Sequence, residues 1–521
     1  MNAIEPNNTG DLQSETPYAD AVEDYSDAHN VRFHLPGHGG GTAGATAVDD
    51  FFGGRLAELD LMPMVDGIDL GESPTPLERS LRLAAEAWGA RRTWFLTNGA
   101  TQGNHLAVLA LRAFGDTVLV QRSVHSSVID GLMLAGMRAR FVAPMVDAEL
   151  GAAQAVTAES VTARLAELAA QGESPVAVYL VSPSYFGFVS DIAAIAEVVH
   201  AAGLPLVVDE AWGAHLGFHP DLPGNALTKG ADLVISSTHK LGGSLTQSAM
   251  LHLGEGLWAD RLEERINRVR HSLQSTSESA LLLVSLDLAR RALATGEERI
   301  GCSLAIADRL RAEIRSAGRF AIASDRYPMF AGWGGTDPFR VVINTRVGGI
   351  GGHHARTLLQ DDSGVLVELA TENAIVAIVG PGTEPDVDAF LAALAALPRL
   401  ARDSGVATPK LPGWGSERMS IRDAYFADSE LVPFNQAAGR ISADSLAAYP
   451  PGIPNVLPGE EILAETITFL RAVAASPSGH VRGAVDAALD TFRVVVHGAE
   501  GHGAVAHRAE AHGAEHEQRP R

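Results

Sequence analysis

The chain has 521 residues, of which 46% are hydrophobic and 20% charged, so it can bury a sizeable core and is not disordered in bulk. Its formal net charge of −23 argues against a nucleic-acid-binding protein, which needs a basic face for phosphate. The single cysteine excludes an internal disulfide and a cysteine metal cluster, and no apolar run is long enough for a membrane span.

The N-terminal residues are polar and acidic, without the basic start and apolar stretch of a signal peptide. We therefore expect a cytoplasmic protein that has neither a membrane nor a nucleic acid as a partner. Residues 1–30 are expected to form a partly disordered leader.

Residues from about 45 to 300 alternate short β-branched runs with longer Ala/Leu-rich segments, which predicts crossover connections and a mostly parallel sheet. Helices are expected over 103–114, 158–170 and 192–202. The last of the expected strands follows its neighbour too closely for a helical crossover, so it is expected to be antiparallel. The seven expected strands are 93–97, 117–120, 140–143, 176–181, 204–208, 232–236 and 248–252.

After Asp337 and Pro338 the pattern changes to strands over 339–347, 365–370 and 374–379, with helices near 353–359 and 385–397. The prediction is an α/β large domain over 31–325, a smaller α+β C-terminal region over 326–485, and a disordered His/Ala/Gly/Glu-rich tail over 486–521. Histidines recur about every five residues in that tail. Such a step spreads the rings around a helix, so no metal site is predicted there.

Polar groups follow four of the expected strands, at 98–103, 182–185, 209–212 and 236–240. In an open α/β sheet, ligands bind at the carboxyl ends of the strands, so these groups are expected to form one site. The first of them, Asn-Gly-Ala-Thr-Gln-Gly, lies between a strand and a helix. Its glycines and the free N–H groups of the helix suit an anion such as phosphate, although an ordinary turn is the alternative.

Two side chains of this set, together with His125 after the expected strand 117–120, are candidates for catalytic or cofactor-binding roles. Lys240, just past a strand end in Ser-Ser-Thr-His-Lys, can form a Schiff base if the site lowers its pKa, and the adjacent hydroxyls and His239 can bind phosphate. Asp209 can pair with a pyridinium nitrogen, or it can cap a helix. His125 can stack on a cofactor ring, or it can be structural.

The assembled pattern resembles the fold-type-I enzymes that use pyridoxal 5′-phosphate (PLP), specifically the Orn/Lys/Arg decarboxylase family. The resemblance covers about Val31 to Leu470. It implies the PLP-dependent transferase fold and decarboxylation of a basic L-amino acid (arginine, lysine or ornithine) to its amine and CO2. The matching motifs are Phe33-His-Leu-Pro-Gly-His38, Asn98–Gly103, Asp209–His219, Ser237-Thr-His-Lys240, Gly243–Ser248, Leu273-Gln-Ser-Thr-Ser277, Gly439-Arg-Ile441 and Tyr449–Pro454.

The resemblance also implies a role for each matching residue. Lys240 matches the Schiff-base lysine, Asp209 the pyridinium partner and His125 the stacking ring. A segment that reaches the partner subunit's cofactor in such enzymes is matched at Ser275 and Thr276, which implies a homodimer with shared active sites. Ala100, Thr101, Ser237 and His239 match phosphate-site positions, and Trp212 and His215 match residues beside the cofactor.

Two departures and several alternatives accompany the resemblance. Gly39 stands where the family usually has a lysine, and the chain begins too close to this motif to hold the family's N-terminal wing domain, so a short form is expected. Glu368, an acid inside an apolar strand, is a candidate to receive the substrate's cationic end, and His215 is a second substrate candidate; a strand-face Glu at a subunit edge is the alternative for Glu368.

The choice among arginine, lysine and ornithine stays open at this stage. An aminotransferase is the main rival, because Arg340 and Arg346 are available for a substrate carboxylate, and a decarboxylase of an unusual amino acid is another. A non-catalytic regulator is disfavoured because Lys240, Asp209 and His125 are all present.

Overall fold

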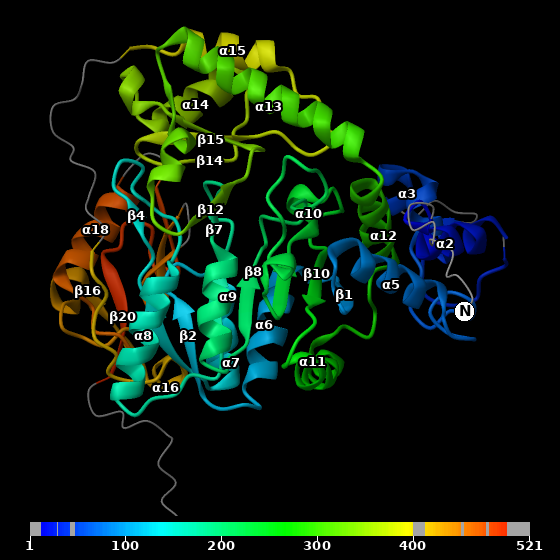
Figure 1. Cartoon of the computed structure of the whole chain (residues 1–521), viewed down its shortest axis with the longest axis horizontal. Helices are drawn as coiled ribbons and strands as arrows, with labels where there is room; N and C mark the ends of the chain where they lie inside the picture. The colour runs from blue at the N-terminus through cyan, green and yellow to red at the C-terminus, as the bar shows by residue number, and fades with distance from the viewer. Residues whose placement is uncertain are drawn as a thin grey trace, which may run out of the picture.

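The structure is a computed structural model that describes residues 12–28, 30–41, 47–399, 412–449, 453–475 and 479–496. The histidine-rich tail from His497 onward lies outside these residues. Three bodies are visible in Figure 1: a central sheet with its helices, a smaller sheet above it, and a C-terminal body (orange to red) at its side.

The central sheet has seven strands in the order β1-β10-β9-β8-β6-β2-β3, which confirms the predicted seven-stranded, mostly parallel sheet. Only β10 runs antiparallel to its neighbours in this sheet, as its closeness to the preceding strand predicted. The strands are β1 (Arg92–Leu96), β2 (Thr117–Gln121), β3 (Arg138–Val142), β6 (Val178–Val181), β8 (Leu206–Asp209), β9 (Leu233–Ser236) and β10 (Ala249–Leu253).

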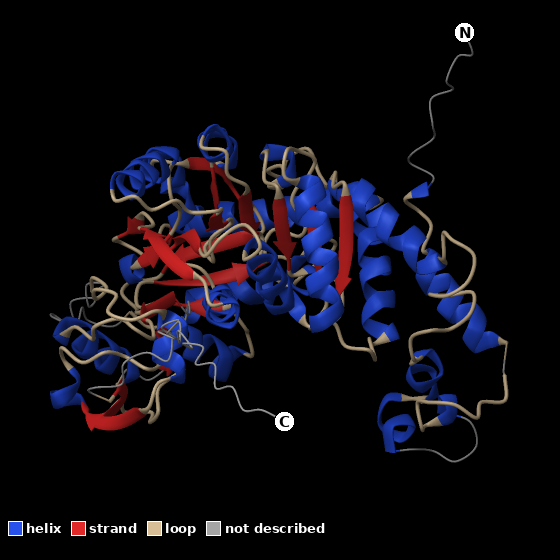
Figure 2. Ribbon diagram, turned by 90° about the horizontal axis from the view of Figure 1, so that it is seen from below, coloured by secondary structure: helices blue, strands red, loops and turns tan. Residues whose placement is uncertain are grey.

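Both faces of this sheet are covered by helices, which Figure 2 shows as blue ribbons on either side of the red strands. Because successive side chains of a strand point to opposite faces, Val207 and Val208 of β8 belong to two different cores. The first core includes side chains of α6 (Gly99–Leu111), α7 (Ser126–Ala135) and α11 (Ala259–Leu273), and the second includes α8 (Ala158–Ala170) and α9 (Ile192–Ala201).

The smaller sheet is antiparallel, in the order β11-β13-β15-β14, and lies at the top of Figure 1. The predicted strands 339–347 and 374–379 are present, whereas only the last two residues of the predicted strand 365–370 pair as β14. The elements are β11 (Ala321–Ile322), β13 (Arg340–Asn344), β14 (Leu369–Ala370) and β15 (Ala374–Ile378), with helices α13 (Glu297–Ala317), α14 (Gly352–Ser363) and α15 (Val387–Ala396).

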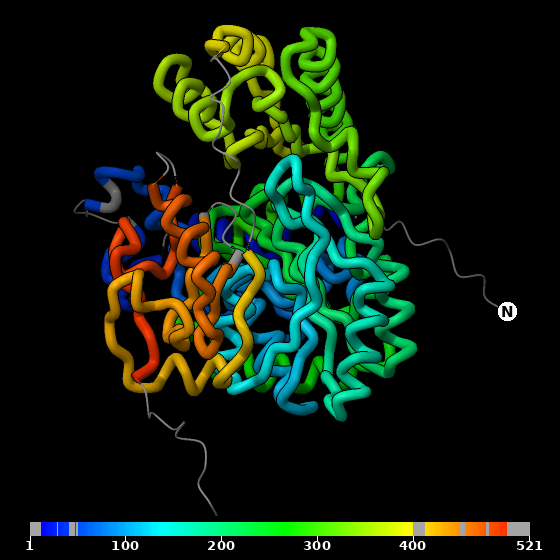
Figure 3. Tube along the Cα trace, turned by 90° about the vertical axis from the view of Figure 1, so that its left-hand side faces the viewer, coloured from blue at the N-terminus to red at the C-terminus, as the bar shows by residue number. Residues whose placement is uncertain are grey.

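The C-terminal body has a hydrophobic core of its own and contacts α7, and Figure 3 shows its orange-to-red tube beside blue and cyan segments. It departs from the predicted domain limits in two ways. The predicted region 326–485 is divided between this body and the smaller sheet, and residues 491–495 of the predicted disordered tail form a strand. The elements are α16 (Ile421–Phe426), β16 (Ser429–Pro433), α17 (Phe434–Ala437), β17 (Leu446–Tyr449), β18 (Ile453–Val456), α18 (Ala464–Ala474), β19 (His480–Arg482) and β20 (Thr491–Val495).

The predicted leader also departs from expectation, because residues 17–27 form helix α2 (Pro17–Asp27) against α5 (Pro76–Trp88) and α12 (Ala280–Ala294). Tyr18 and Val22 are buried in the core, and the Tyr18 N–H donates to Asp287 Oδ2 at 3.0 Å. Across the described ranges, no helix combines the length and apolarity that a membrane crossing needs. The predicted cytoplasmic location and the absence of a nucleic-acid partner stay predictions.

Candidate active site

A cavity of about 210 Å³ lies at the carboxyl ends of the central strands. It contains eight of the ten residues predicted to bind the cofactor, because the turns after β1, β2, β8 and β9 all open into it. These eight are Ala100, Thr101, His125, Asp209, Trp212, Ser237, His239 and Lys240; the cavity is completed by Gly99, Asn104, Ser127, Val181, Tyr185 and Ala211.

Lys240 lies on the single-turn helix α10 (Thr238–Leu241) that follows β9, with its Nζ 3.9 Å from the centroid of the Trp212 ring. The pKa of Lys240 is lowered to about 8, mainly by burial and also by Arg340, while Asp209 and Glu368 oppose the shift. A neutral amine is a nucleophile, whereas an ammonium is not. The site therefore meets the condition that a Schiff-base lysine requires.

Asp209 is the last residue of β8 and is 3% exposed. Its Oδ1 accepts the Ala211 N–H at 3.0 Å, and its Oδ2 accepts Asn104 Nδ2 at 3.0 Å. Turn residues rather than a helix follow it, so the helix-cap alternative does not apply. Two donors thus stabilise a buried carboxylate on the cavity wall.

One end of the cavity is the start of α6. Gly99 has φ +70°, a conformation that glycine adopts without strain, and its N–H donates to Gln247 O at 2.6 Å. The Asn98 side chain does not cap the helix but accepts Gln247 Nε2 at 3.1 Å. Ala100 and Thr101 of the first helical turn line the cavity, and the N–H groups of a first turn have no partner within the helix, so this end of the cavity suits an anion.

Two histidines flank this cavity. His239 is held by a 2.7 Å hydrogen bond between its Nδ1 and Ser248 O, and burial lowers its pKa. His125 precedes α7, where its Nδ1 accepts the Ser127 N–H at 3.2 Å and lies 2.8 Å from Ser127 Oγ. Burial lowers the pKa of His125 as well, with further lowering from Lys240 and from Arg482 of β19.

Comparisons with known proteins agree with this geometry. The sequence profile of the Orn/Lys/Arg decarboxylase major domain matches residues 16–334, and that of the family's C-terminal domain matches residues 416–479. An arginine decarboxylase of Bacillus anthracis is 34% identical, over 93% of this chain and 98% of its own length. An arginine decarboxylase of Bacillus subtilis (strain 168) is 33% identical over the same shares.

The chain belongs to the Orn/Lys/Arg decarboxylase family. Its predicted activity class, decarboxylation of a basic amino acid by a carboxy-lyase, is thereby confirmed. The fold is also that of the constitutive lysine decarboxylase of Escherichia coli, with a TM-score of 0.75 at 21% identity over 92% of this chain and 82% of that one. The family's enzymes are of the PLP-dependent type.

Four predicted residues of this decarboxylase lie outside the cavity lining. Ser275 and Thr276 are exposed in the turn after α11. Glu368 is exposed just before β14, close enough for its charge to raise the pKa of Lys240 and of Arg340. His215 is fully buried, with its Nε2 3.0 Å from Asp337 Oδ1, so it is placed as an internal support rather than a substrate contact.

The two arginines considered for a substrate carboxylate are placed differently in the decarboxylase. Arg340 is fully buried beside Trp212 and donates from Nη1 to Ser184 O at 2.8 Å and from Nη2 to Trp212 O at 3.1 Å. Arg346 is largely exposed and pairs with Glu372 at 3.2 Å. Arg340 therefore holds the backbone around Trp212 by hydrogen bonds, and Arg346 is paired with Glu372 beside the smaller sheet.

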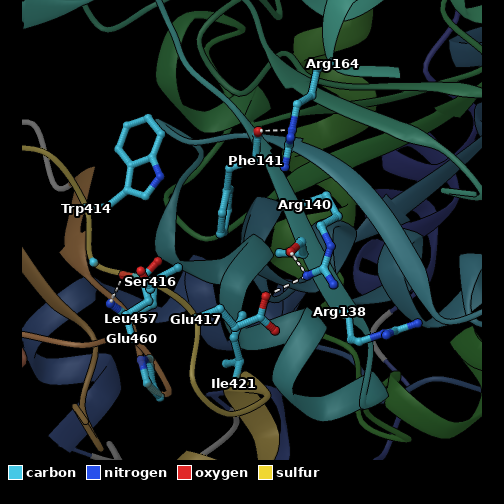
Figure 4. Close-up of a pocket in the computed structure, with 13 residues that line it drawn as sticks. Arg138, Arg140, Phe141, Arg164, Trp414, Ser416, Glu417, Ile421, Leu457 and Glu460 are labelled. Atoms are coloured by element: carbon cyan, nitrogen blue, oxygen red, sulfur yellow. Dashed lines mark hydrogen bonds and ion pairs between the residues drawn. The ribbon is translucent and has the colours of Figure 1, made fainter. Parts of the chain in front are cut away.

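A second cavity of the decarboxylase, of about 220 Å³, separates β3 from the C-terminal body (Figure 4). Arg140 crosses it and pairs with Glu417 at 2.6 Å and with Glu173 at 2.5 Å. None of the predicted site residues lines this cavity.

Proposed function

We propose that this decarboxylase holds PLP on Lys240 and releases CO2 from L-arginine. The observation that carries the proposal is that Lys240, buried Asp209 and the first turn of α6 open into one cavity. The arginine decarboxylases of the two Bacillus species match nearly their full length, which favours arginine over lysine and ornithine.

The residues present fit PLP by their chemistry. A dianionic phosphate suits the N–H groups at the start of α6, together with Ser237 and His239. A pyridinium nitrogen suits the carboxylate of Asp209, which two donors already orient. An aldehyde suits an amine whose pKa burial lowers to about 8. When bound, PLP supplies the electron sink for the pair left behind as the carboxylate departs.

Three residues of the chain have the remaining roles in the proposed reaction. Asp209 would keep a positive charge on the ring nitrogen of bound PLP, and the buried walls of the cavity would exclude water that weakens this interaction. Lys240 would hold a proton and donate it to the substrate Cα, at the position that the departing carboxylate leaves. Glu368 receives the substrate's guanidinium at the outer end of the site.

The direct test measures CO2 and amine formed from L-arginine, L-lysine and L-ornithine separately, with PLP and without any keto acid. Release of agmatine and CO2 from arginine at the highest kcat/KM is the expected result. A higher kcat/KM with lysine or ornithine would overturn the substrate. Turnover that depends on a keto acid would instead favour an aminotransferase.

We further propose a homodimer whose two active sites each use residues of both subunits. Ser275 and Thr276 are exposed and lie outside the cavity of their own chain, in a segment that resembles one reaching the partner's cofactor. Val31 and Phe33 support a second copy as partner, because they are 85% and 97% exposed and would be buried by an adjoining subunit.

Mixed dimers test this arrangement. Subunits with Lys240→Ala are combined with subunits carrying Ser275→Ala and Thr276→Val. With shared sites, one of the two sites in a mixed dimer has both residues intact, so the mixture is more active than either parent. Activity no higher than the average of the parents would contradict sharing.

A further inference from the structure

Asn104, on the second turn of α6, lies at the centre of a buried hydrogen-bond chain that reaches both Asp209 and His125. Its Nδ2 donates to Asp209 Oδ2 at 3.0 Å and to Ser127 Oγ at 2.8 Å, and its Oδ1 accepts the Tyr179 hydroxyl at 2.8 Å. Asn104 is 1% exposed, and Tyr179 is fully buried. Every hydrogen-bonding atom of this carboxamide group therefore has a protein partner.

The orientation of this carboxamide follows from its neighbours. If the group were turned over, its oxygen would face the Asp209 carboxylate, and two acceptors would meet without a proton between them. Burial raises the pKa of Tyr179, and Asp209 raises it further, so the Tyr179 hydroxyl stays a donor. The amide hydrogens must therefore point toward Asp209 and Ser127.

The direction of the next bond follows from this one. Because Ser127 Oγ accepts a hydrogen bond from Asn104 Nδ2, its own hydroxyl is free to donate a hydrogen bond to His125 Nδ1, 2.8 Å away. The Ser127 backbone N–H donates to the same Nδ1 at 3.2 Å and cannot reverse its role. His125 Nδ1 is thus an acceptor, and the proton of the neutral ring is on Nε2.

We propose that Asn104 is a positioning residue that sets the charges of two groups beside the cofactor: it holds Asp209 as a carboxylate and, through Ser127, His125 as a neutral ring protonated at Nε2. This inference rests on the proposed function, because it assigns a purpose to the PLP site. Asn104 and Ser127 both line the cavity but were not among the predicted site residues.

Setting both charges serves the proposed chemistry. A ring nitrogen kept positive by Asp209 would repel an imidazolium stacked on the same ring, whereas a neutral imidazole avoids that repulsion. A cation at His125 would also favour the substrate carboxylate in the ground state, where charge stabilisation raises the barrier to losing CO2.

The charged groups that act on His125 come from three elements: Asp209 at the end of β8, Lys240 on α10 and Arg482 on β19. Burial of the ring has the largest effect and lowers the pKa of His125, and the two cations add to it against the opposing carboxylate. The electrostatics therefore act in the same direction as the hydrogen bonds.

Ser127→Ala tests the assignment in the PLP-free protein. The rate at which diethyl pyrocarbonate modifies His125 is followed against pH by peptide mass spectrometry, since only the unprotonated ring reacts. The pH at which the modification rate reaches half its maximum is the His125 midpoint. Loss of the hydroxyl donor removes one hydrogen bond that requires an unprotonated Nδ1, so this midpoint should rise by about 0.5–1 pH unit. An unchanged or lowered midpoint would overturn the proposal.

Thr93→Val is the matched control, because Thr93 Oγ1 lies 2.9 Å from Nδ1 of another buried histidine, His252, outside the cavity. It should leave the His125 midpoint unchanged. Asn104→Leu removes the donor to Asp209 as well, so it should raise the same midpoint and also weaken PLP binding about tenfold more than Ser127→Ala does. Equal PLP affinities for the two variants would contradict the link to Asp209.

The midpoint is measured without PLP or turnover, so its outcome is separate from that of the proposed function. A raised midpoint in a protein that decarboxylates none of the three amino acids would overturn the function and keep the charge assignment. Full decarboxylation with an unchanged midpoint would do the reverse.

Discussion

The cavity favours the neutral, nucleophilic form of the Lys240 amine, because burial removes the water that would solvate the ammonium group. Only the neutral amine attacks an aldehyde, and its fraction falls tenfold for each pH unit below the pKa of about 8. The rate of PLP attachment to PLP-free protein should therefore rise about tenfold per pH unit below pH 8 and level off above it. Borohydride reduction and peptide mass spectrometry measure the attachment, Lys240→Ala should show none, and a rate that still rises toward pH 10 would contradict the shift.

Glu368 is the residue through which arginine's side chain is expected to be recognised. Removing one partner of a charged hydrogen bond costs about 1.5–3 kcal/mol, so Glu368→Gln should raise KM for arginine roughly 10- to 100-fold with a smaller change in kcat. Glu372→Gln, on the same small sheet but paired with Arg346, is the matched control and should leave KM unchanged. Equal KM values for the two variants would exclude Glu368 from substrate binding.

The residues that follow strand ends could be predicted from sequence, because one rule places them at the same edge of the sheet. Asn104 and Tyr179 could not be predicted in this way. Asn104 enters the cavity from the second turn of a helix, and Tyr179 donates to Asn104 from within a strand, so only the packed arrangement of α6 on the sheet brings these side chains together beside Asp209. The available signal was weak, because Asn104 is one of several polar residues in the first half of α6.

Helix α6 can approach the sheet closely because Gly103 has no side chain. A Cβ added at Gly103 would lie 2.7 Å from Ile235 Cγ2 and 3.2 Å from Leu96 Cδ1. Overpacking costs about 1–3 kcal/mol, which offsets or exceeds the roughly 1 kcal/mol that alanine adds to a helix, so Gly103→Ala should lower the free energy of unfolding. It should also weaken PLP binding by displacing the first turn of α6.

Gly54 of α4 (Gly54–Leu59) is the control for Gly103, because nothing lies within 4 Å of its added Cβ. Gly54→Ala should leave the stability unchanged or raise it by up to about 1 kcal/mol, with the same PLP affinity. Denaturant unfolding and PLP titration of both variants decide the matter, and equal stabilities for the two would contradict the steric account.

At the scale of elements, runs of buried β-branched residues located the central strands to within about two residues. The C-terminal body was not resolved from sequence, for a physical reason. Four of the five residues of β16 are exposed and only Leu431 and Val432 form an apolar pair, which is too short to mark a strand, and its partner β20 lies far along the chain. Helix α2 was missed because its few buried residues, such as Tyr18 and Val22, are spaced among acidic ones.

The C-terminal body is joined to the central sheet by a buried ion pair close to the active site. Arg122, which follows β2 and precedes His125 by three residues, donates from Nη1 and Nη2 to the Glu460 carboxylate at 2.7 and 2.8 Å. Its guanidinium also lies 4.6 Å from the Phe141 ring centroid and 5.4 Å from that of Trp414. Both charged side chains are almost completely buried, so little solvent is available to either of them in place of its partner.

Breaking this pair from one side should therefore be costly, because it leaves the other side as a buried, poorly paired charge. We expect Glu460→Gln to lower the free energy of unfolding by about 3–5 kcal/mol and the double variant Arg122→Met with Glu460→Leu to recover most of that loss. The neighbouring pair Arg418–Glu461, at 2.7 Å, is more exposed, so Glu461→Gln should cost less than about 1 kcal/mol. Denaturant unfolding compares the stabilities of the variants. A loss of unfolding free energy for Glu460→Gln no larger than that for Glu461→Gln would show that the Arg122–Glu460 pair does not join the two bodies. PLP affinity, measured on the same variants, tests whether this pair also positions His125.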